Sequence, residues 1–176
     1  MNTRKNIVLI GMPGVGKSTI GVILAKQLGY QFVDADLLIQ QQEKRLLKEI
    51  IAEDGIDGFL KIENQVNASI QTEGAVIATG GSVIYGKEAM EHLSSIGTVV
   101  YLKLPYPALR RRLGNLKARG VVLREGQSLK NLYDERIPLY EQYADLTVNE
   151  SGLKIEETRE ALEKMLEEYW KRAVEK

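Results

Sequence analysis

Apolar runs and amphipathic stretches alternate along this chain, and their order predicts an α/β protein. Five short apolar runs have the length and the Val- and Ile-rich composition of buried β-strands. They cover residues 6–10, 31–34, 74–78, 97–102 and 144–148. Because helical patterns separate these runs, we expect a parallel sheet with helices on both faces. The sequence therefore predicts one three-layer α/β/α domain over residues 1–176, built on a five-stranded sheet.

The stretches between the apolar runs predict helices, because their apolar positions recur at helical spacing. The predicted helices cover residues 19–26, 37–42, 46–53, 59–72, 87–94, 105–113, 128–143 and 155–176. Gly29 is expected to end the first helix, and Ser128 to cap the start of a later one. Residues 55–58 predict a break, and residues 114–127, which have mixed charge and no clear period, predict a loop.

The segment from Gly11 to Ser18 matches the P-loop pattern G-x-x-x-x-G-K-[ST] at every fixed position. It lies between a predicted strand and a predicted helix, where glycines let backbone N–H groups surround a phosphate and the helix N-terminus adds positive potential. We expect Lys17 to reach the β- and γ-phosphates of ATP and the Ser18 hydroxyl to bind Mg²⁺. A chance glycine-rich turn is the alternative, and this context argues against it. The predicted nucleotide-binding residues of the loop are Gly14, Val15, Gly16, Lys17, Ser18 and Thr19.

Polar and glycine residues follow the second and third predicted strands, at the sheet edge where ligands bind in such folds. Asp34 is expected to assist Ser18 at the metal, acting through a water molecule. Asp36 is expected to be the base or the orienting acceptor for a hydroxyl group, and to cap the helix that follows it. Gly80 and Gly81 form either a simple turn or a place where a small substrate approaches the backbone.

Arginines gather after the fourth predicted strand. Three stand in succession on a predicted helix, at residues 110–112, and Arg119 and Arg124 follow in the loop. An arginine-bearing loop beside a phosphate site indicates a mobile lid that closes over ATP. Arg136, on the next predicted helix, either binds an anion or forms an exposed salt bridge, and the residues alone leave both possibilities open.

The amino-acid composition argues against several classes of function. Lys and Arg together equal Asp and Glu at 24 each, so overall charge gives no support to nucleic acid binding. The absence of cysteine excludes thiolate catalysis and Cys-based zinc sites, and the single histidine, His92, excludes multi-His sites. We expect His92 to be exposed on a surface helix. No apolar run approaches the ~20 residues of a membrane span, and nothing resembles a signal peptide. We therefore expect a cytoplasmic monomer with a small-molecule partner and no membrane partner.

Taken together, these residues resemble the shikimate kinase family from Asn6 to about Val148. The resemblance rests on the P-loop, on residues 32–36, on Gly58 and Phe59 followed by Glu63, and on residues 78–81, 100–102, 136–140 and 144–145. It implies a fold like that of nucleoside monophosphate kinases, with a lid at about 114–127 and an acceptor-binding helical region at about 36–72. The implied reaction is Mg²⁺-dependent transfer of phosphate from ATP to a hydroxyl of shikimate.

The resemblance also implies a role for each matching residue. Asp34 would serve the metal through water, and Asp36 would contact the substrate hydroxyls as the base. The remaining implied roles are substrate-pocket lining for Gly80 and Gly81, adenine packing for Arg112, a catalytic lid contact for Arg119 and substrate carboxylate binding for Arg136.

The chain departs from the family pattern at three places. Leu60 stands where the family has an arginine that binds the substrate carboxylate, and Ser82 replaces the third glycine of a triplet. The lid sequence Arg-Pro-Leu-Leu is Arg-Gly-Val-Val at residues 119–122. Losing one charge-assisted contact costs ~1.5–3 kcal/mol, and Lys61 points about 100° away on a helix. The predicted acceptor is therefore shikimate or a related cyclic or polyol compound with fewer anionic groups.

Two other functions are weighed against this one. A nucleoside monophosphate kinase or gluconate-type kinase would share the P-loop, but residues 34–36 and 136–140 argue against it. A nucleotide-binding regulatory protein without kinase activity would not need a base, so Asp36 argues against that function.

Overall fold

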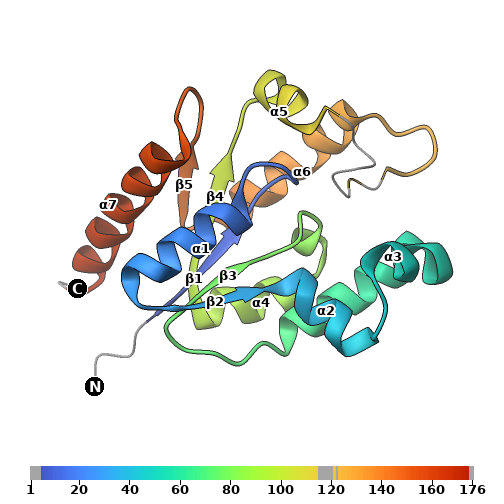
Figure 1. Ribbon diagram of the computed structural model, residues 1–176, viewed down its shortest axis with the longest axis horizontal. Coiled ribbons are helices and arrows are strands. Elements are labelled where there is room, and N and C mark those ends of the chain that lie inside the picture. The colour runs from blue at the N-terminus through green and yellow to red at the C-terminus, as the bar shows by residue number, and fades with distance from the viewer. Residues whose placement is uncertain (1–4, 115–120, 122, 175–176) are drawn as a thin grey trace.

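The computed structural model of the protein describes residues 5–114, 121 and 123–174. Within these residues a five-stranded sheet, in the order β2-β3-β1-β4-β5, lies between two layers of helices (Figure 1). Every neighbouring pair of strands is parallel. The strands are β1 (Asn6–Ile10), β2 (Gln31–Asp34), β3 (Ala75–Ala78), β4 (Gly97–Lys103) and β5 (Leu146–Asn149). The predicted α/β architecture is confirmed, and each observed strand overlaps its predicted run.

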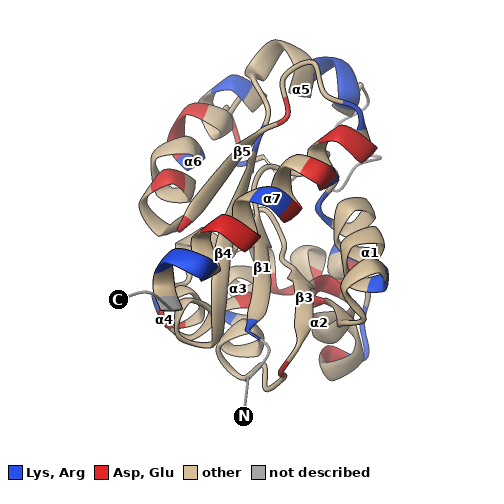
Figure 2. Ribbon diagram, turned by 90° about the vertical axis from the view of Figure 1, so that its left-hand side faces the viewer, with Lys and Arg blue, Asp and Glu red and all other residues tan. Residues whose placement is uncertain are grey.

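Helices cover both faces of this sheet. On one face α1 (Lys17–Leu28) packs on β1, β2 and β3, and α7 (Ile155–Val174) packs on α1 and β5. On the other face α4 (Lys87–Ile96) packs on β1 and β4, and α6 (Leu129–Tyr143) packs on β4. Figure 2 shows β1 and β3 free of charged residues between these layers, with the charged residues gathered on the helices. The central strands are therefore buried on both sides, as their unbroken apolar runs predict.

A helical lobe extends from one edge of the sheet (Figure 1). It consists of α2 (Ala35–Glu43) and α3 (Leu47–Ala68), which share a small core of Ile39, Ile50, Phe59 and Val66. The two helices predicted at 46–53 and 59–72 are one helix with a kink at Gly55, whose φ of 73° and ψ of 176° are not helical. The predicted break is thus real, but the chain resumes its helix directly after it.

Two shorter helices and two caps complete the fold. The short helix α5 (Tyr106–Leu113) agrees with its prediction, whereas the 3₁₀ turn η1 (Val83–Tyr85) was not predicted. Gly29 ends α1 in the left-handed conformation, with its N–H donating to the Ala25 carbonyl. The Ser128 hydroxyl accepts a hydrogen bond from the Asn131 N–H at 3.1 Å. Both predicted caps are confirmed.

The expected exposure of His92 is wrong. The ring is half-buried on α4, and its Nε2 lies 2.6 Å from the Ile70 carbonyl oxygen. The helix pattern alone placed it outside, but α4 packs against α3, and the chain leaving α3 covers the ring. Among the described residues, no helix is long and apolar enough to cross a membrane.

Candidate active site

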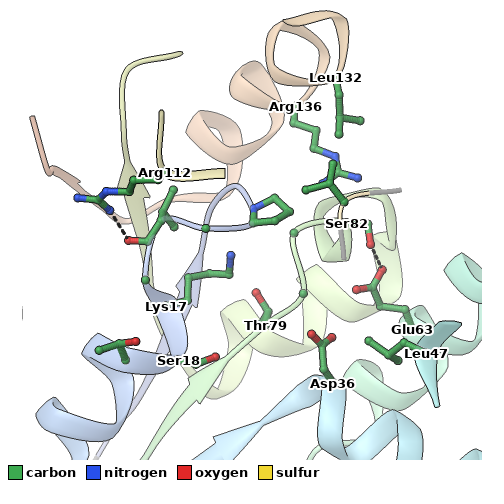
Figure 3. A pocket seen from close by; sticks show the side chains of 18 of the residues that line it. Lys17, Ser18, Asp36, Leu47, Glu63, Thr79, Ser82, Arg112, Leu132 and Arg136 are labelled. Atoms are coloured by element: carbon green, nitrogen blue, oxygen red, sulfur yellow. Dashed lines mark hydrogen bonds between the residues drawn. The ribbon is translucent and has the colours of Figure 1, made fainter. Parts of the chain in front are cut away.

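A cleft of about 1740 Å³ lies at the carboxyl ends of the strands, where the sheet topology predicts it. The P-loop and the start of α1 form one wall, and residues from α2, α3, α6 and the turn after β3 form the facing wall (Figure 3). Residues from α5 and from the chain after β5 close the nucleotide end of the cleft. Residues predicted from separate parts of the sequence therefore meet in one place.

The P-loop has the backbone that a phosphate cradle requires. Gly14 and Gly16 adopt φ values of 84° and 99°, which side-chain-bearing residues rarely adopt. A methyl group on Gly14 would also lie 2.7 Å from Leu113. No side chain caps the N-terminus of α1, so its first backbone N–H groups are available to an anion. Ser18 and Thr19 are exposed at this helix end. These features fit a nucleotide triphosphate.

Lys17 is positioned by the loop that it serves. Its side chain is buried, and Nζ donates hydrogen bonds to the carbonyl oxygens of Gly11 at 2.7 Å and Met12 at 2.9 Å. Burial lowers the pKa of Lys17 to about 8, and the nearby Asp36 carboxylate opposes this shift. The ammonium group is thus held against the P-loop backbone, as Figure 3 shows, on the wall of the cleft opposite Asp36.

The aspartate that ends β2 and the one in the first turn of α2 take different positions. Asp34, not Asp36, caps α2: its Oδ1 accepts hydrogen bonds from the N–H groups of Asp36 at 3.0 Å and Leu37 at 3.2 Å. The predicted cap at Asp36 is therefore wrong, because the helix begins two residues earlier than its apolar pattern. This leaves the Asp36 carboxylate free of capping, and it lines the cleft whereas Asp34 does not. Burial, and secondarily Asp34, raises the pKa of Asp36 against the opposing effect of Lys17.

The glycines after β3 bring charged groups close to the backbone. A methyl group on Gly80 would lie 2.5 Å from Glu63 Oε1 and 3.0 Å from Asp36 Oδ1. A methyl group on Gly81 would lie 2.9 Å from Arg136 Nη1. The side chains of three charged residues therefore close around these two glycines.

Arg136 lies inside the cleft. It is 7% exposed, its guanidinium lies over the Tyr85 ring at 5.4 Å, and its Nε has no hydrogen-bond partner among the described residues. The alternative of an exposed helix salt bridge is wrong. Tyr140, one turn further along α6, donates a hydrogen bond to the Gly81 carbonyl at 2.5 Å and so ties the helix to the turn after β3. A buried, incompletely paired guanidinium facing a cleft is suited to binding an anion.

The other predicted arginines differ in position. Arg112 lines the cleft, donates to the Val15 carbonyl at 3.2 Å and lies 3.7 Å from Glu150. Arg119 lies outside the described residues. Arg124 lines the cleft mouth, where its exposed guanidinium pairs with Asp57 of α3 at 2.7 Å.

Three departures from the family pattern face this cleft or its lid. Leu60 is half-buried in the facing wall and offers no hydrogen bond, and Lys61 is exposed and does not line the cleft. Ser82 also lines it and donates a hydrogen bond to Glu63 Oε2 at 2.6 Å. Of the altered lid residues only Val121 is described, and it is buried against the cleft.

Two carboxyl groups were missed as site residues. Glu63 and Glu150 are each 2% exposed and line the cleft, and burial raises the pKa of each to about 7. Glu63 carried a signal in the sequence, because it interrupts the apolar stripe of α3 four residues after Phe59 and three before Val66. Glu150 follows a short strand and had no comparable signal.

Comparisons with known proteins agree with this geometry. The family model described as shikimate kinase matches residues 13–169. The shikimate kinase of Vibrio parahaemolyticus is 37% identical over 171 residues, covering 96% of this chain and 99% of that protein. That of Actinobacillus succinogenes is 40% identical over 152 residues, covering 84% and 87%. A structure of shikimate kinase from Acinetobacter baumannii in complex with shikimate matches with a TM-score of 0.82 and 31% identity, covering 97% of this chain and 95% of that one. The chain therefore belongs to the shikimate kinase family of ATP-dependent kinases.

Proposed function

We propose that this protein transfers the γ-phosphoryl group of ATP to a ring hydroxyl of shikimate. The observation that carries the proposal is the position of Asp36, which lines the cleft on the wall opposite the P-loop (Figure 3) and interacts electrostatically with Lys17. Phosphoryl transfer needs an aligned hydroxyl between a phosphate cradle and a proton acceptor. The P-loop supplies the first and Asp36 the second.

On the nucleotide side, the backbone from Gly14 to Thr19 surrounds the phosphates and Lys17 releases its carbonyl partners to bind them. Arg112 packs against the base, and Arg119 contacts the phosphates from the lid. Mg²⁺ would be held by the Ser18 hydroxyl together with the nucleotide phosphates, with Asp34 acting through water, and it would neutralise phosphate charge. Among the described residues no cluster of three or more acidic or histidine side chains could hold a metal without such help.

On the acceptor side, five residues form what we call the acceptor wall: Asp36, Glu63, Gly80, Gly81 and Arg136. The proton of the reacting hydroxyl passes to the Asp36 carboxylate as the oxygen bonds to the γ-phosphorus. The bond from that phosphorus to the β–γ bridging oxygen breaks, and ADP leaves. The raised pKa of Asp36 makes it a better proton acceptor than an exposed aspartate. Arg136 binds the carboxylate of the acceptor without a second arginine, because position 60 is leucine.

The experiment is an ATP-consumption assay with shikimate, compared with polyols, sugar acids and nucleoside monophosphates. We expect shikimate to be the preferred acceptor, with its monophosphate ester identified by ³¹P NMR. Asp36→Asn should lower kcat at least about 100-fold, whereas the control Asp54→Asn, at an exposed position of α3 that does not line the cleft, should not. Faster turnover of a polyol would replace shikimate as the acceptor, and no stimulation by any compound would favour the non-catalytic regulatory protein.

The monomeric state and the cytoplasmic location also remain predictions. Light scattering after size-exclusion chromatography tests the first, and fractionation of cells that produce the protein tests the second.

A further inference from the structure

Glu63 is a buried carboxyl group that forms no salt bridge within the described part of the chain. It lies on α3, one turn from Leu60, and is 2% exposed. Its Oε2 accepts the hydrogen bond from Ser82, as Figure 3 shows, and its Oε1 has no hydrogen-bond partner among the described residues. A buried carboxylate is stable only when it is paired, so this environment favours the neutral acid.

Glu63 and the other charged residues of the acceptor wall lie against the same backbone segment, the turn after β3. Glu63 Oε1 and Asp36 Oδ1 both lie within 3.0 Å of the point where Gly80 would carry a methyl group. The guanidinium of Arg136 contacts the next residue, Gly81, in the same way. Glu63 is therefore close enough to interact electrostatically with both Asp36 and Arg136.

The charges around Glu63 explain why its protonation state affects the binding of an anionic acceptor. The described charged groups that interact with Glu63 are Lys17 from the P-loop, Asp36 from α2 and Arg136 from α6. The titratable Tyr140 of α6 also interacts with it, and Tyr85 of η1, which packs on α3, lies against Arg136. Asp36 balances one of the two cations. The second positive charge is left for an acceptor carboxylate only if Glu63 is neutral, because an ionised Glu63 would balance it instead.

The ionisation of Glu63 falls in an accessible pH range. Burial raises its pKa to about 7; the Ser82 hydrogen bond opposes this, Asp36 raises the pKa further, and Arg136 and Lys17 lower it. Burial also raises the pKa of Tyr140, which therefore stays neutral across this range.

We propose that the protonation state of Glu63 determines whether an anionic acceptor binds. As a neutral acid that accepts the Ser82 hydrogen bond, Glu63 leaves Arg136 available to an acceptor carboxylate. As a carboxylate, Glu63 competes with the acceptor for Arg136. This rests on the proposed function above, in which an anionic acceptor binds Arg136. Binding of an anionic acceptor is then coupled to protonation of Glu63. An uncharged acceptor of the same shape has no such coupling.

The test compares shikimate with its uncharged methyl ester at saturating Mg-ATP, between about pH 6 and about pH 8.5. We expect KM for shikimate to rise towards about tenfold per pH unit above the Glu63 pKa, with kcat changing much less, while KM for the ester changes less than about threefold. At saturating Mg-ATP the phosphates that Lys17 binds keep it protonated, so the ratio of the two KM values isolates Glu63.

Two variants make the test specific. Glu63→Gln, a neutral side chain of the same shape, should make KM for shikimate independent of pH. Glu53→Gln, on the same helix but paired with Arg45 away from the cleft, should keep the wild-type profile. A flat profile in the wild type, or a pH-dependent one in Glu63→Gln, overturns the proposal.

Two further measurements test the proposal even if no acceptor is turned over. Calorimetry of shikimate binding in two buffers at about pH 7.5 should show proton uptake in the wild type and none in Glu63→Gln. If shikimate neither binds nor reacts, the proposed function fails, and urea unfolding still tests Glu63. Because its pKa is raised in the folded state, the wild type should lose stability relative to Glu63→Gln as pH rises from about 5 to about 8. A constant difference between the two would show that Glu63 does not titrate in this range.

Discussion

Adding one methyl group at Gly80 should lower kcat/KM for the acceptor without changing the affinity for the nucleotide. In Gly80→Ala the new carbon would lie 2.5 Å from Glu63 Oε1 and 3.0 Å from Asp36 Oδ1. Gly80 does not have a positive φ, so the effect comes from space and not from backbone strain. Glu63 must move by at least about half an ångström, and Asp36 by less. Since a displacement of about 1 Å costs about 100-fold in rate, we expect kcat/KM for the acceptor to fall about 10- to 100-fold, or ~1.4–2.8 kcal/mol.

The assay is a double-mutant cycle with Glu63→Ala. Removing the Glu63 side chain removes the closer contact, so Gly80→Ala should cost less than about fivefold in that background. Affinity for a non-hydrolysable ATP analogue, measured by calorimetry, should stay within about twofold throughout, because the P-loop forms the other wall. Equal losses in both backgrounds, or a loss of nucleotide affinity, would refute the reasoning. Thermal melting of each variant checks that the fold is intact.

Three further changes test other parts of the structure. Arg136→Lys should raise the acceptor KM about 10- to 100-fold and leave the ATP KM unchanged, because lysine lacks the planar fork that binds a carboxylate. Ser128→Ala should lower the free energy of unfolding by about 1 kcal/mol in urea titrations, because it removes the cap of the helix that carries Arg136. Glu150 has a folded pKa raised to about 7 by burial, so its penalty is absent at about pH 4 and complete above about pH 7. Glu150→Gln should therefore stabilise the protein at about pH 8 relative to about pH 4, by at most about 3 kcal/mol, and equal effects at the two pH values would contradict this.

The sheet and the P-loop could be predicted because their signals are local. Each strand is a short apolar run, and the loop is specified by glycines whose conformation is set within a few residues. Parallel pairing then places the strand ends together, which is why Asp36 and Gly80 were expected at one site. One error arose where a boundary of one or two residues decides which side chain faces the cleft. The cap of α2 is such a case, because Asp34 and Asp36 are equally good caps and only the first helical residue distinguishes them.

The acceptor wall could be predicted only in part, because contacts between distant segments define it. Arg136 was ambiguous in the sequence since nothing near it tells whether α6 turns that residue inward. The structure buries it because Tyr85 and Gly81, about 50 residues earlier, pack against it. Glu63 carried only the signal of a charge within an apolar stripe, which does not say what pairs with it.

The substitutions at positions 60 and 82 illustrate this dependence. Considered separately against the family pattern, Leu60 removes a cation and Ser82 adds a hydroxyl group. Each change alone would be expected to weaken acceptor binding. In the structure both changes concern the same carboxyl group, because Leu60, one turn away on α3, offers Glu63 no salt bridge, and Ser82 supplies a neutral hydrogen bond to it. A lost cation usually leaves a buried carboxylate unpaired, which is strongly destabilising. Here a hydrogen-bonded neutral acid avoids that cost, and the positive charge of Arg136 remains available to an anionic acceptor. Restoring the arginine alone, as Leu60→Arg, should therefore hold Glu63 ionised and abolish the pH dependence of the shikimate KM, and a profile unchanged from wild type would show that the two positions are not coupled.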